Sequence, residues 1–400
     1  MHGQRKSPSY SNTFTRILAI DLGKFNSVAC VYERATHEHR FVSAATTPKM
    51  IHDLLVEHQT PRPSDTLLVI ETCDVAGWVY DIAVALGIEV AIANPSSEAW
   101  RWTRVKRKTD KDDALKLAKL TLLGQLPTVH MPSPQQRQRR RLVHYRRALV
   151  ERRTAIKNQV RSIYSQQGLS LPLRGKAWTK AGIKQMSDDA RTIESCAIDE
   201  LWRGRLHVEL QLLDSLSKQI DQVDAKLDAL GAEDDRCKLL QTIPGVGPRL
   251  AETVVAHIDD PHRFKNARQV ASYAGLVPKQ FESGTMKRSG RITRRGPTLL
   301  RSMLVEVAWM VYMRNPWARS FVDRISRGIP SRKKIAIVAL ARKLLVTQWA
   351  MLRDGTSWRD PCAGEDKGAD GRCAPGGCGV SPPEDTGHVT ALSSVEVAIG

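Results

Sequence analysis

The first part of the chain alternates short apolar runs with stretches of helical periodicity. Apolar runs predict strands at 16–21, 27–33, 39–44, 66–71 and 88–92, and helical spacing predicts helices at 47–58, 76–86 and 110–123. Leu22-Gly23-Lys24 makes a tight turn between the first two strands, so these are expected to form a hairpin. The order of elements predicts an α/β fold over residues 16–130, with a mixed sheet covered by helices.

The middle of the chain, residues 131–235, has the pattern of two long helices. Residues 135–164 predict a polar, arginine-rich helix, and an irregular stretch follows over 166–200. In the next helix the apolar residues repeat in three- and four-residue steps, which predicts a coiled-coil seam: Leu213, Leu216, Ile220, Val223, Leu227 and Leu230. The seam is expected to pack either back on the arginine-rich helix or against another subunit, and the pattern leaves both open.

Residues 236–358 predict a second compact domain, mainly α-helical. Its apolar helices are expected at 238–243, 249–258, 267–274, 297–313 and 332–352. Between the first two, Gly245-Val246-Gly247 lets the backbone approach a partner closely, and the next helix presents free amides to a phosphate. This segment resembles a helix-hairpin-helix element, so Gly245 and Gly247 are candidate contacts to a DNA backbone. A plain glycine-rich connection is the alternative.

The two ends of the chain are polar. Residues 1–15 predict a disordered leader without the apolar core of a signal peptide, and residues 359–400, rich in Gly, Pro and Ser, predict a disordered tail. No run of eighteen uncharged apolar residues occurs, so no membrane span is expected. Cys30, Cys73, Cys196 and Cys237 are scattered without a disulfide framework, which fits a reducing cytoplasm.

Net charge narrows the class of partner. The formal charge is +19, and because residues 361–400 carry −4, residues 1–360 carry +23. Such an excess favours a polyanion. Residues 135–164 contain ten basic residues against Glu151 alone, which favours phosphate contact over a solvated helix face. The candidate nucleic-acid-binding residues are Arg139, Arg140, Arg141, Arg146, Arg147 and Arg153 there, and Lys287, Arg288, Arg291, Arg294 and Arg295 in a basic loop before a helix.

Carboxylates follow two of the predicted strands and begin a helix. Asp21 ends the first strand, Glu71 ends the fourth, and Asp110 and Asp113 lie three residues apart, on one face of the helix that begins near 110. Two magnesium ions about 3.5–4 Å apart, held by such hard ligands, can assist phosphodiester chemistry. Each acid also has an ordinary explanation, as a turn residue or in a helix cap by Thr109 or Asp110.

These segments resemble the DEDD domain of insertion-sequence family 110 transposases, which has a RuvC-like, RNase H-like fold. The resemblance rests on Ile17-Leu18-Ala19-Ile20-Asp21, the strand that ends in Glu71, and the block from Lys108 to Ala114. It implies that Asp21, Glu71, Asp110 and Asp113 coordinate magnesium. The extra acid Asp112 departs from the family pattern and leaves open which of Asp112 and Asp113 acts, although helical geometry favours Asp113.

The carboxy-terminal part resembles the transposase domain of the same family. Gly275-Leu276-Val277-Pro278, Ser283-Gly284, Gly290-Arg291-Ile292-Thr293 and Gly296 carry this resemblance. The residues alone favour an ordinary turn at Ser283, because no neighbouring histidine supplies a base. The resemblance implies instead that Ser283 is a nucleophile that forms a covalent phosphoserine link to DNA, and that the two domains form a composite active site.

The resemblance therefore implies a site-specific recombinase, associated with the nucleoid, that moves its own insertion sequence. Its expected partners are donor and target DNA, a guide (bridge) RNA and further copies of the chain in a dimer or tetramer. One alternative is a metal-dependent junction endonuclease that never links to DNA. The other is a nucleic-acid-binding protein without catalysis.

Overall fold

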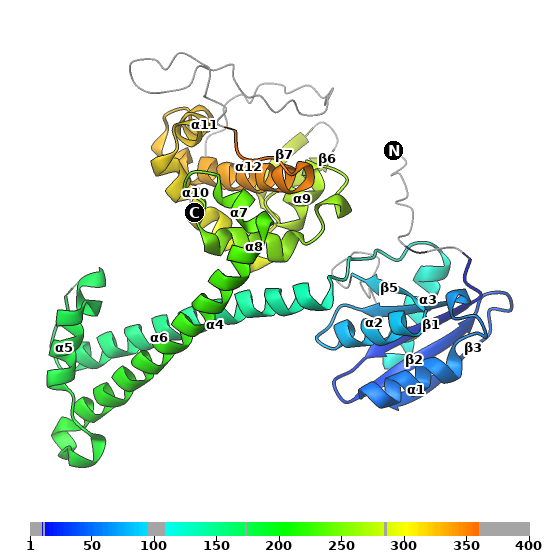
Figure 1. The fold of residues 1–400 in the computed structure, drawn as a ribbon, viewed down its shortest axis with the longest axis horizontal. Coiled ribbons are helices and arrows are strands. Elements are labelled where there is room, and N and C mark those ends of the chain that lie inside the picture. Colours follow the sequence, from blue (N-terminus) through cyan, green and yellow to red (C-terminus); the bar gives the residue numbers. More distant parts are fainter. Residues whose placement is uncertain (1–9, 11–12, 95–108, 173, 284–285, 360–400) are drawn as a thin grey trace. The chain divides into compact units, whose positions relative to one another are not determined.

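The computed structural model describes residue 10 and residues 13–94, 109–172, 174–283 and 286–359. The chain divides into two compact units between Gln138 and Arg139. The first unit is built on a sheet, and the second is mostly helical, as the apolar pattern predicted (Figure 1). The finer predicted division, at 130 and 235, stays a prediction.

The predicted strands and helices of the first unit are all present, with ends that agree to within one residue. They are β1 (Arg16–Leu22), β2 (Asn26–Glu33), β3 (His39–Ala45), α1 (Pro48–His58), the 3₁₀ turn η1 (Pro63–Asp65), β4 (Thr66–Glu71), α2 (Ala76–Ala85), β5 (Glu89–Ala93) and α3 (Asp110–Leu122). The sheet order is β3-β2-β1-β4-β5. The β1–β2 hairpin and β3 are antiparallel, whereas β4 and β5 run parallel to β1.

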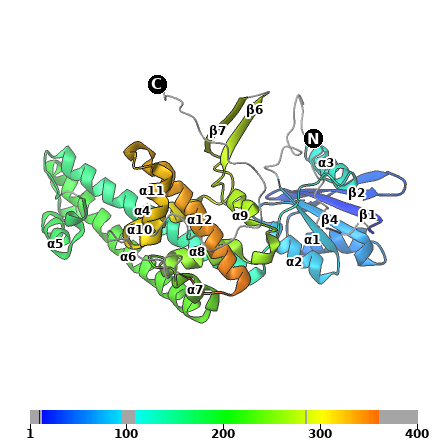
Figure 2. The same ribbon diagram turned by 90° about the horizontal axis from the view of Figure 1, so that it is seen from above.

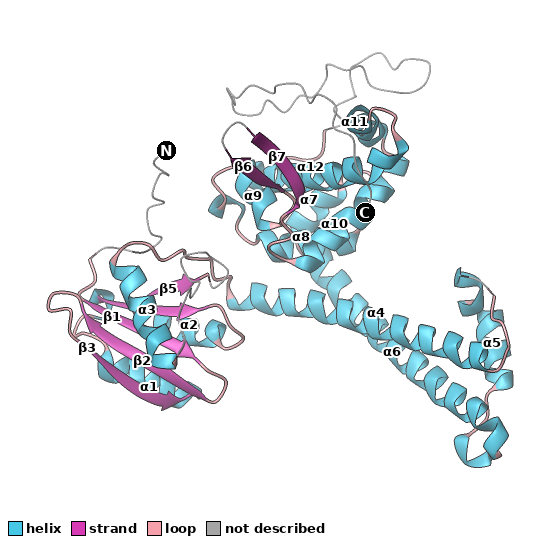
Figure 3. Cartoon of the chain, turned by 180° about the vertical axis from the view of Figure 1, so that it is seen from behind, coloured by secondary structure: helices cyan, strands magenta, loops and turns pink. Residues whose placement is uncertain are grey.

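The two faces of this sheet are covered by different helices (Figure 3). Alternate residues of a strand point to opposite faces, so β1 and β4 each divide their apolar residues between two cores. Ile17 and Ala19 belong to the core that includes Ala114 and Leu117 of α3. Leu18 and Ile20 belong to the core that contains residues of α1 and α2.

The amino-terminal segment corrects one expectation. Tyr10 and Phe14 are buried in the core on the α3 face, and the Tyr10 hydroxyl donates a hydrogen bond to the Thr121 carbonyl at 3.2 Å. Two aromatic side chains in an otherwise polar stretch are sufficient to order it where an apolar surface is open. The predicted disorder is therefore wrong for residue 10 and residues 13–15, and the remaining leader and the tail beyond 359 lie outside the described residues.

Two long helices form an antiparallel hairpin in the second unit. α4 (Pro134–Gln166) and α6 (Leu201–Glu233) correspond to the two predicted long helices, and the stretch between them contains α5 (Lys180–Asp189) with the 3₁₀ turns η3 (Arg174–Trp178), η4 (Ile193–Ser195) and η5 (Ile198–Glu200). Tyr164 near the end of α4 packs with Leu206 near the start of α6. Val143 near the start of α4 packs with Leu227 near the end of α6.

The predicted apolar seam of α6 is packed within the chain. Leu213, Ile220 and Leu227 are buried, and Val223 packs beside Leu227 against Val143 of α4. Of the two alternatives that the sequence left open, packing back on the arginine-rich helix is the one observed. Pairing of the seam between subunits stays a prediction.

The rest of the second unit is a helical domain with one small hairpin (Figure 2). Its elements are α7 (Asp235–Gln241), α8 (Pro248–Ile258), η6 (Pro261–Arg263), α9 (Ala267–Tyr273), β6 (Pro278–Ser283), β7 (Met286–Ile292), α10 (Thr298–Arg314), α11 (Pro316–Ser326), η7 (Pro330–Arg332) and α12 (Lys333–Asp354). The largest core cluster joins α7, α8, α9, α10, α11 and α12.

Two segments of this domain differ from the sequence prediction, and α5 lies in a stretch that was predicted to be irregular. The stretch expected to be a basic loop contains the antiparallel pair β6–β7. Most of its residues are polar, so the regular apolar–polar alternation that marks a strand is absent. α11 was not predicted either, although Asn315 accepts a cap hydrogen bond from the Trp317 amide at 3.0 Å and Pro316 stands at the first helical position.

The last helix, with the turn before it, is long and apolar enough to span a membrane by length and composition alone, over Pro330–Asp354. Half of its most apolar window is buried inside the structure. Leu340, Leu344 and Trp349 belong to the largest core cluster, which is the usual position of such a helix in a compact domain. Its apolar character is therefore explained by internal packing.

Candidate active site

Asp21 and Glu71 occupy equivalent positions at the ends of two adjacent parallel strands. Ile20 of β1 pairs with Ile70 of β4, so the next residue on each strand is the acid. Neighbouring strands lie about 4.8 Å apart. Ile17 and Ala19 face the α3 core, and strand alternation places Asp21 on that same face. The same argument from Leu67 and Val69 places Glu71 there, and both acids are half-buried.

A third acid reaches this face from the covering helix. Asp113 is buried, at 8% exposure, next to Ala114 and one turn before Leu117, which both pack on the sheet. Asp110 is the first residue of α3 and is exposed. Burial of a carboxylate requires compensation by a cation or hydrogen-bond donors. Asp21, Glu71 and Asp113 therefore form a set of carboxylates on one face, built from three different elements.

Asp112 has a different role from its neighbour. Its Oδ2 accepts hydrogen bonds from the Thr109 amide at 3.0 Å and the Thr109 hydroxyl at 2.7 Å, while the Thr109 hydroxyl accepts from the Asp112 amide at 3.3 Å. This reciprocal arrangement is a capping box at the start of α3. Thr109 is thus the N-cap, one of the two candidates from the sequence, and the extra acid of the motif serves the helix terminus.

The donor chemistry of this face suits a divalent metal ion. Carboxylate oxygens are the hard ligands that magnesium prefers. Within the described residues, however, no three His, Cys, Asp or Glu side chains converge closely enough to enclose an ion. Residues 95–108, which join β5 to Thr109 just before α3, lie outside the described part of the chain. The acids therefore share a face of the sheet and a hard-ligand chemistry, but they do not enclose an ion within the part of the chain that the structure describes.

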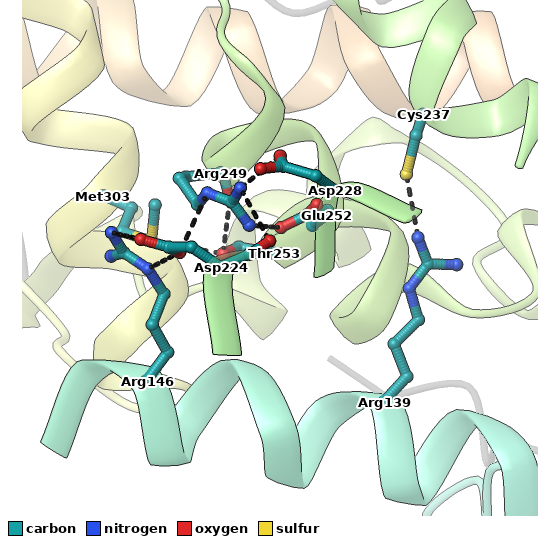
Figure 4. A network of polar contacts seen from close by, with 9 residues as sticks. All are labelled: Arg139, Arg146, Asp224, Asp228, Cys237, Arg249, Glu252, Thr253 and Met303. Carbon is teal, nitrogen blue, oxygen red and sulfur yellow. Dashed lines mark hydrogen bonds and ion pairs between the residues drawn. The ribbon is translucent and has the colours of Figure 1, made fainter. Parts of the chain in front are cut away.

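Several arginines predicted to contact nucleic acid have partners inside the second unit (Figure 4). Arg139 pairs with Asp234 and donates to the Cys237 sulfur at 3.0 Å. Arg146 binds both carboxylate oxygens of Asp224, with the Nη2–Oδ2 distance at 3.1 Å. The strong positive charge of α4 is thus partly balanced by acids of α6 and of the α6–α7 junction, which the local sequence could not reveal.

Two further arginines of α4 also have partners in this unit. The Nε atom of Arg140 donates to the Ala256 carbonyl of α8 at 3.0 Å. Arg147 pairs with Glu151 on its own helix and with Glu306 of α10. Arg141 is exposed and Arg153 is half-buried. Of the arginines proposed on α4, Arg141 therefore has the surroundings most compatible with a phosphate contact.

Arg249 is the centre of a network that the sequence did not indicate. It pairs with Asp224 and Asp228 of α6 and donates from Nη1 to Glu252 Oε2 at 2.9 Å. Burial raises the pKa of Glu252, although the charge of Arg249 opposes this. The sequence signal that could have indicated this network is the position of Asp224 and Asp228, each of which directly follows a residue of the predicted seam. The network borders a cavity of about 70 Å³, lined also by Val143, Leu299 and Met303, far smaller than a typical ligand pocket.

Two histidines join α4 to α8. His257 is 1% exposed, and its Nδ1 donates to the Thr253 carbonyl at 2.7 Å. Its Nε2 must then be an acceptor, so the 3.3 Å contact with His144 Nε2 is a hydrogen bond donated by His144. Burial lowers the pKa of His257 to about 3, and the charge of Arg140 acts in the same direction.

The two glycines of the predicted phosphate-binding turn have unlike surroundings. Gly245 has a φ of +94°, and a Cβ there would lie 3.1 Å from Val311 Cγ2, so this glycine permits a turn packed against α10. A Cβ at Gly247 would meet nothing within 4 Å. Gly247 precedes α8 as its N-cap residue. Close approach of a phosphate is therefore compatible with Gly247, whereas Gly245 serves internal packing.

Ser283 is the last residue of β6 and pairs with Met286 at the start of β7. Ser283 thus lies at the end of the strand next to residues 284–285, which are outside the described part of the chain. The four arginines of the segment, Arg288, Arg291, Arg294 and Arg295, are exposed. Lys287 lies in β7. The predicted serine and basic residues are therefore carried by one hairpin and the connection that follows it.

Two family profiles match separate parts of the chain. One, described as Transposase, matches residues 18–167 and includes the four acids that the sequence motif indicated. The other, described as Transposase IS116/IS110/IS902 family, matches residues 237–323 and includes Ser283.

Proteins similar to this chain include transposases and a gene-inverting protein. The putative transposase y4pF/y4sB of Sinorhizobium fredii is 30% identical over 298 residues, 74% of this chain and 74% of its own length. The probable family 20 transposase of Pseudomonas aeruginosa is 28% identical over 348 residues, 86% of this chain and 98% of its own. The pilin gene-inverting protein of Moraxella bovis is 28% identical over 255 residues, 62% of this chain and 67% of its own.

Proposed function

This chain belongs to the IS110 family of transposases, enzymes of DNA strand transfer, and from that premise we propose that it is the recombinase of an insertion sequence, acting through magnesium-bound carboxylates and a serine nucleophile. The observation that carries the proposal is the placement of Asp21 and Glu71 at equivalent ends of adjacent parallel strands, on the face covered by the helix that carries Asp113. The similarity to a pilin gene-inverting protein supports recombination as the outcome.

Asp21, Glu71 and Asp113, with Asp110 at the exposed start of α3, are assigned to hold the metal. Magnesium, when bound, supplies positive charge that stabilises the phosphate oxygens during transfer. The paired strands keep Asp21 and Glu71 in place, and the packing around the buried Asp113 restricts the movement of its side chain. Asp112 is not assigned, because its carboxylate caps α3.

Ser283 is assigned as the nucleophile. Its oxygen attacks the scissile phosphorus, a serine–phosphate bond forms, and one phosphorus–oxygen bond of the DNA backbone breaks. The deoxyribose oxygen leaves as a hydroxyl and takes the proton that the serine loses. A hydroxyl end of a second strand then attacks the phosphoserine, rejoins the DNA and releases the serine. Exposed arginines beside the hairpin support the assignment, because they suit a phosphate-rich partner.

The test is to trap a covalent protein–DNA adduct with DNA that carries the joined ends of the element. The wild-type chain is expected to give an adduct that survives denaturation, and Ser283→Ala to give none. Ser289→Ala, a serine of the same hairpin, is the matched control and should keep the adduct. An adduct that persists in Ser283→Ala contradicts the assignment of the nucleophile.

The same assay separates the two alternatives. A junction endonuclease would cleave DNA without any adduct, and Ser283→Ala would leave cleavage intact. A binding protein without catalysis would keep every activity after Asp21→Asn or Glu71→Gln. The proposal instead expects both acid variants to lose the adduct, and removal of magnesium by a chelator to do the same reversibly.

A guide RNA and assembly into a dimer or tetramer complete the proposal, on the strength of the family resemblance and the net charge of +19. Sequencing of nucleic acid that copurifies with the chain is expected to return one structured RNA encoded beside the gene. Light scattering is expected to give a mass of two or four chains. Recovery of random cellular RNA would contradict the guide RNA. A mass of one chain would contradict the assembly.

A further inference from the structure

The β6–β7 hairpin carries an exposed aromatic side chain that has no role in the proposed chemistry of the acids and Ser283. Phe281, in the middle of β6, is 58% exposed, and it pairs across the hairpin with the exposed Arg288. Large aromatic side chains are usually buried, and this ring is outside the core cluster beneath the hairpin. An aromatic side chain left exposed on a polar strand is a candidate contact to a partner.

The hairpin holds the ring against its own backbone. A Cβ added at Gly290 of β7 would lie 2.9 Å from Phe281 Cε2, so the ring lies over this glycine and a side chain there would displace it. Diagonal contacts of this kind fix the direction of an aromatic side chain on a two-stranded ribbon. The ring of Phe281 therefore rests beside Gly290 at one edge, while more than half of the residue stays exposed to solvent.

The surroundings select the chemistry of the partner. Exposed basic residues lie on the same hairpin and on the segment that follows it: Lys279, Arg288, Arg291, Arg294 and Arg295. An apolar protein surface would have to desolvate these charges, whereas a nucleic-acid strand supplies phosphates for them and bases for the ring. Positions 281 and 283 are two residues apart on β6, about 7 Å along the strand.

We propose that Phe281 stacks on a nucleobase of the DNA strand next to the scissile phosphate and so positions that strand at the hairpin. This inference rests on the proposed role of Ser283 for the identity of the phosphate. The ring supplies a flat apolar surface, and the arginines neutralise the backbone on either side. Phe281 is a positioning residue in this scheme, because it contacts the DNA and leaves bond making to other groups.

The first test measures stacking without chemistry. Full-length Ser283→Ala, with its copurified nucleic acid, is mixed with a thymidine oligonucleotide that has 2-aminopurine at its centre. Stacking is expected to quench the fluorescence, and Phe281→Ala or Phe281→Leu in this background to lose most of the quenching. Phe281→Trp should restore it, because the requirement is for an aromatic face. Equal quenching by the Leu variant would overturn the inference.

The second test places the contact relative to the cleaved bond. Alanine replacement of a stacking aromatic costs about 1–3 kcal/mol, so Phe281→Ala should lower adduct yield by about 5- to 150-fold. On DNA with an abasic site beside the cleavage position, wild type and Phe281→Ala should give equal adduct yields. Ile335→Ala, which removes another exposed apolar side chain of the same unit, is the control and should leave yield unchanged.

The two proposals can fail separately. A wild-type adduct that Phe281→Ala leaves at full yield overturns the stacking inference and leaves Ser283 as the nucleophile. Quenching that depends on Phe281, in a chain that never forms an adduct, overturns the nucleophile and keeps stacking on DNA. Loss of the copurified RNA in Phe281→Ala, with normal quenching of the DNA probe, would show that the ring binds RNA instead.

Discussion

Asp112 and Asp113 are consecutive acids with opposite surroundings. Asp113 is 8% exposed on the face shared with Asp21, whereas Asp112 is exposed and engaged with Thr109. We expect Asp113→Asn to abolish the DNA adduct and to leave the unfolding free energy of the first unit nearly unchanged. Asp112→Ala should lower that free energy by about 1 kcal/mol and keep the adduct. Denaturant unfolding and adduct trapping on both variants distinguish a metal ligand from a helix cap. Loss of the adduct in Asp112→Ala, with loss of stability in Asp113→Asn, would refute the assignment.

The burial of His257 predicts that the stability of the second unit depends on pH. Its folded pKa is about 3 because burial disfavours the charged ring, and an unfolded histidine has a pKa near 6.5. Between these values the unfolded chain binds more protons, so stability rises with pH in this window. Acidification from pH 7 to 5 should cost about 2 kcal/mol from this residue.

The measurement is urea unfolding of the second unit at pH 7 and pH 5. His257→Gln keeps a polar side chain without a titrating ring and should flatten the difference between the two pH values. The groups that face His257 are Arg140, His144 and Arg263. His262→Gln is the matched control, because it replaces an exposed histidine of the same unit that does not face His257. An equal pH dependence in wild type and His257→Gln would contradict the prediction.

At the scale of single residues, the sequence predicted position correctly where position follows from a local pattern. Asp21 and Glu71 lie where they were expected, because each follows the apolar run of a buried strand. The partners of Arg139 and Arg146 could not be predicted, because Asp234 at the α6–α7 junction and Asp224 of α6 lie far along the chain. A one-sided charge pattern on a helix therefore overstates the charge that is available to nucleic acid.

At the scale of elements, α4 and α6 are joined by ion pairs as well as by apolar contacts. Arg146 and Asp224 each keep 26% of their side-chain surface exposed and form a two-point contact. A double-mutant cycle with Arg146→Gln and Asp224→Asn should give a coupling of about 1–2 kcal/mol in urea unfolding.

The exposed pair Lys218–Asp214 on α6 is the control for that cycle and should give a smaller coupling. Burial acts to raise the pKa of Asp224, but hydrogen bonding and charge from Arg146 and Arg249 outweigh it, so the pKa is lowered. The Arg146–Asp224 coupling is therefore expected above pH 4 and should disappear as pH falls through the lowered pKa. A coupling that is insensitive to acid would indicate another origin.

Most elements of the first unit were predictable because they bury a continuous apolar run or a regular helical face. β1 and β4 bury their apolar residues on both faces, which is why they read as uninterrupted runs. β6 and β7 were not predictable, because residues such as Lys279, Gln280, Arg288 and Ser289 give no alternation. Polar strands are positioned by backbone pairing, which a sequence pattern does not record.

At the scale of the whole molecule, the two units are expected to unfold as separate transitions. The clusters that contain Leu18 and Ala19 draw all their residues from the first unit, and the cluster that contains Leu304 draws all of its residues from the second. α4 contributes only its first turn to the first unit. Calorimetry of the full chain should therefore show two heat-absorption peaks.

Core substitutions assign the two peaks, because Leu18 and Leu304 are both fully buried. Leu18→Ala and Leu304→Ala should each cost about 2–5 kcal/mol in the unit that contains them. Each variant should lower the temperature of one peak and leave the other in place. Magnesium should raise only the peak that Leu18→Ala lowers, since a ligand stabilises the unit that binds it. A single peak that moves as a whole with either variant would mean that the chain unfolds as one cooperative body. A magnesium effect on the peak that Leu304→Ala lowers would place the ion away from Asp21 and Glu71.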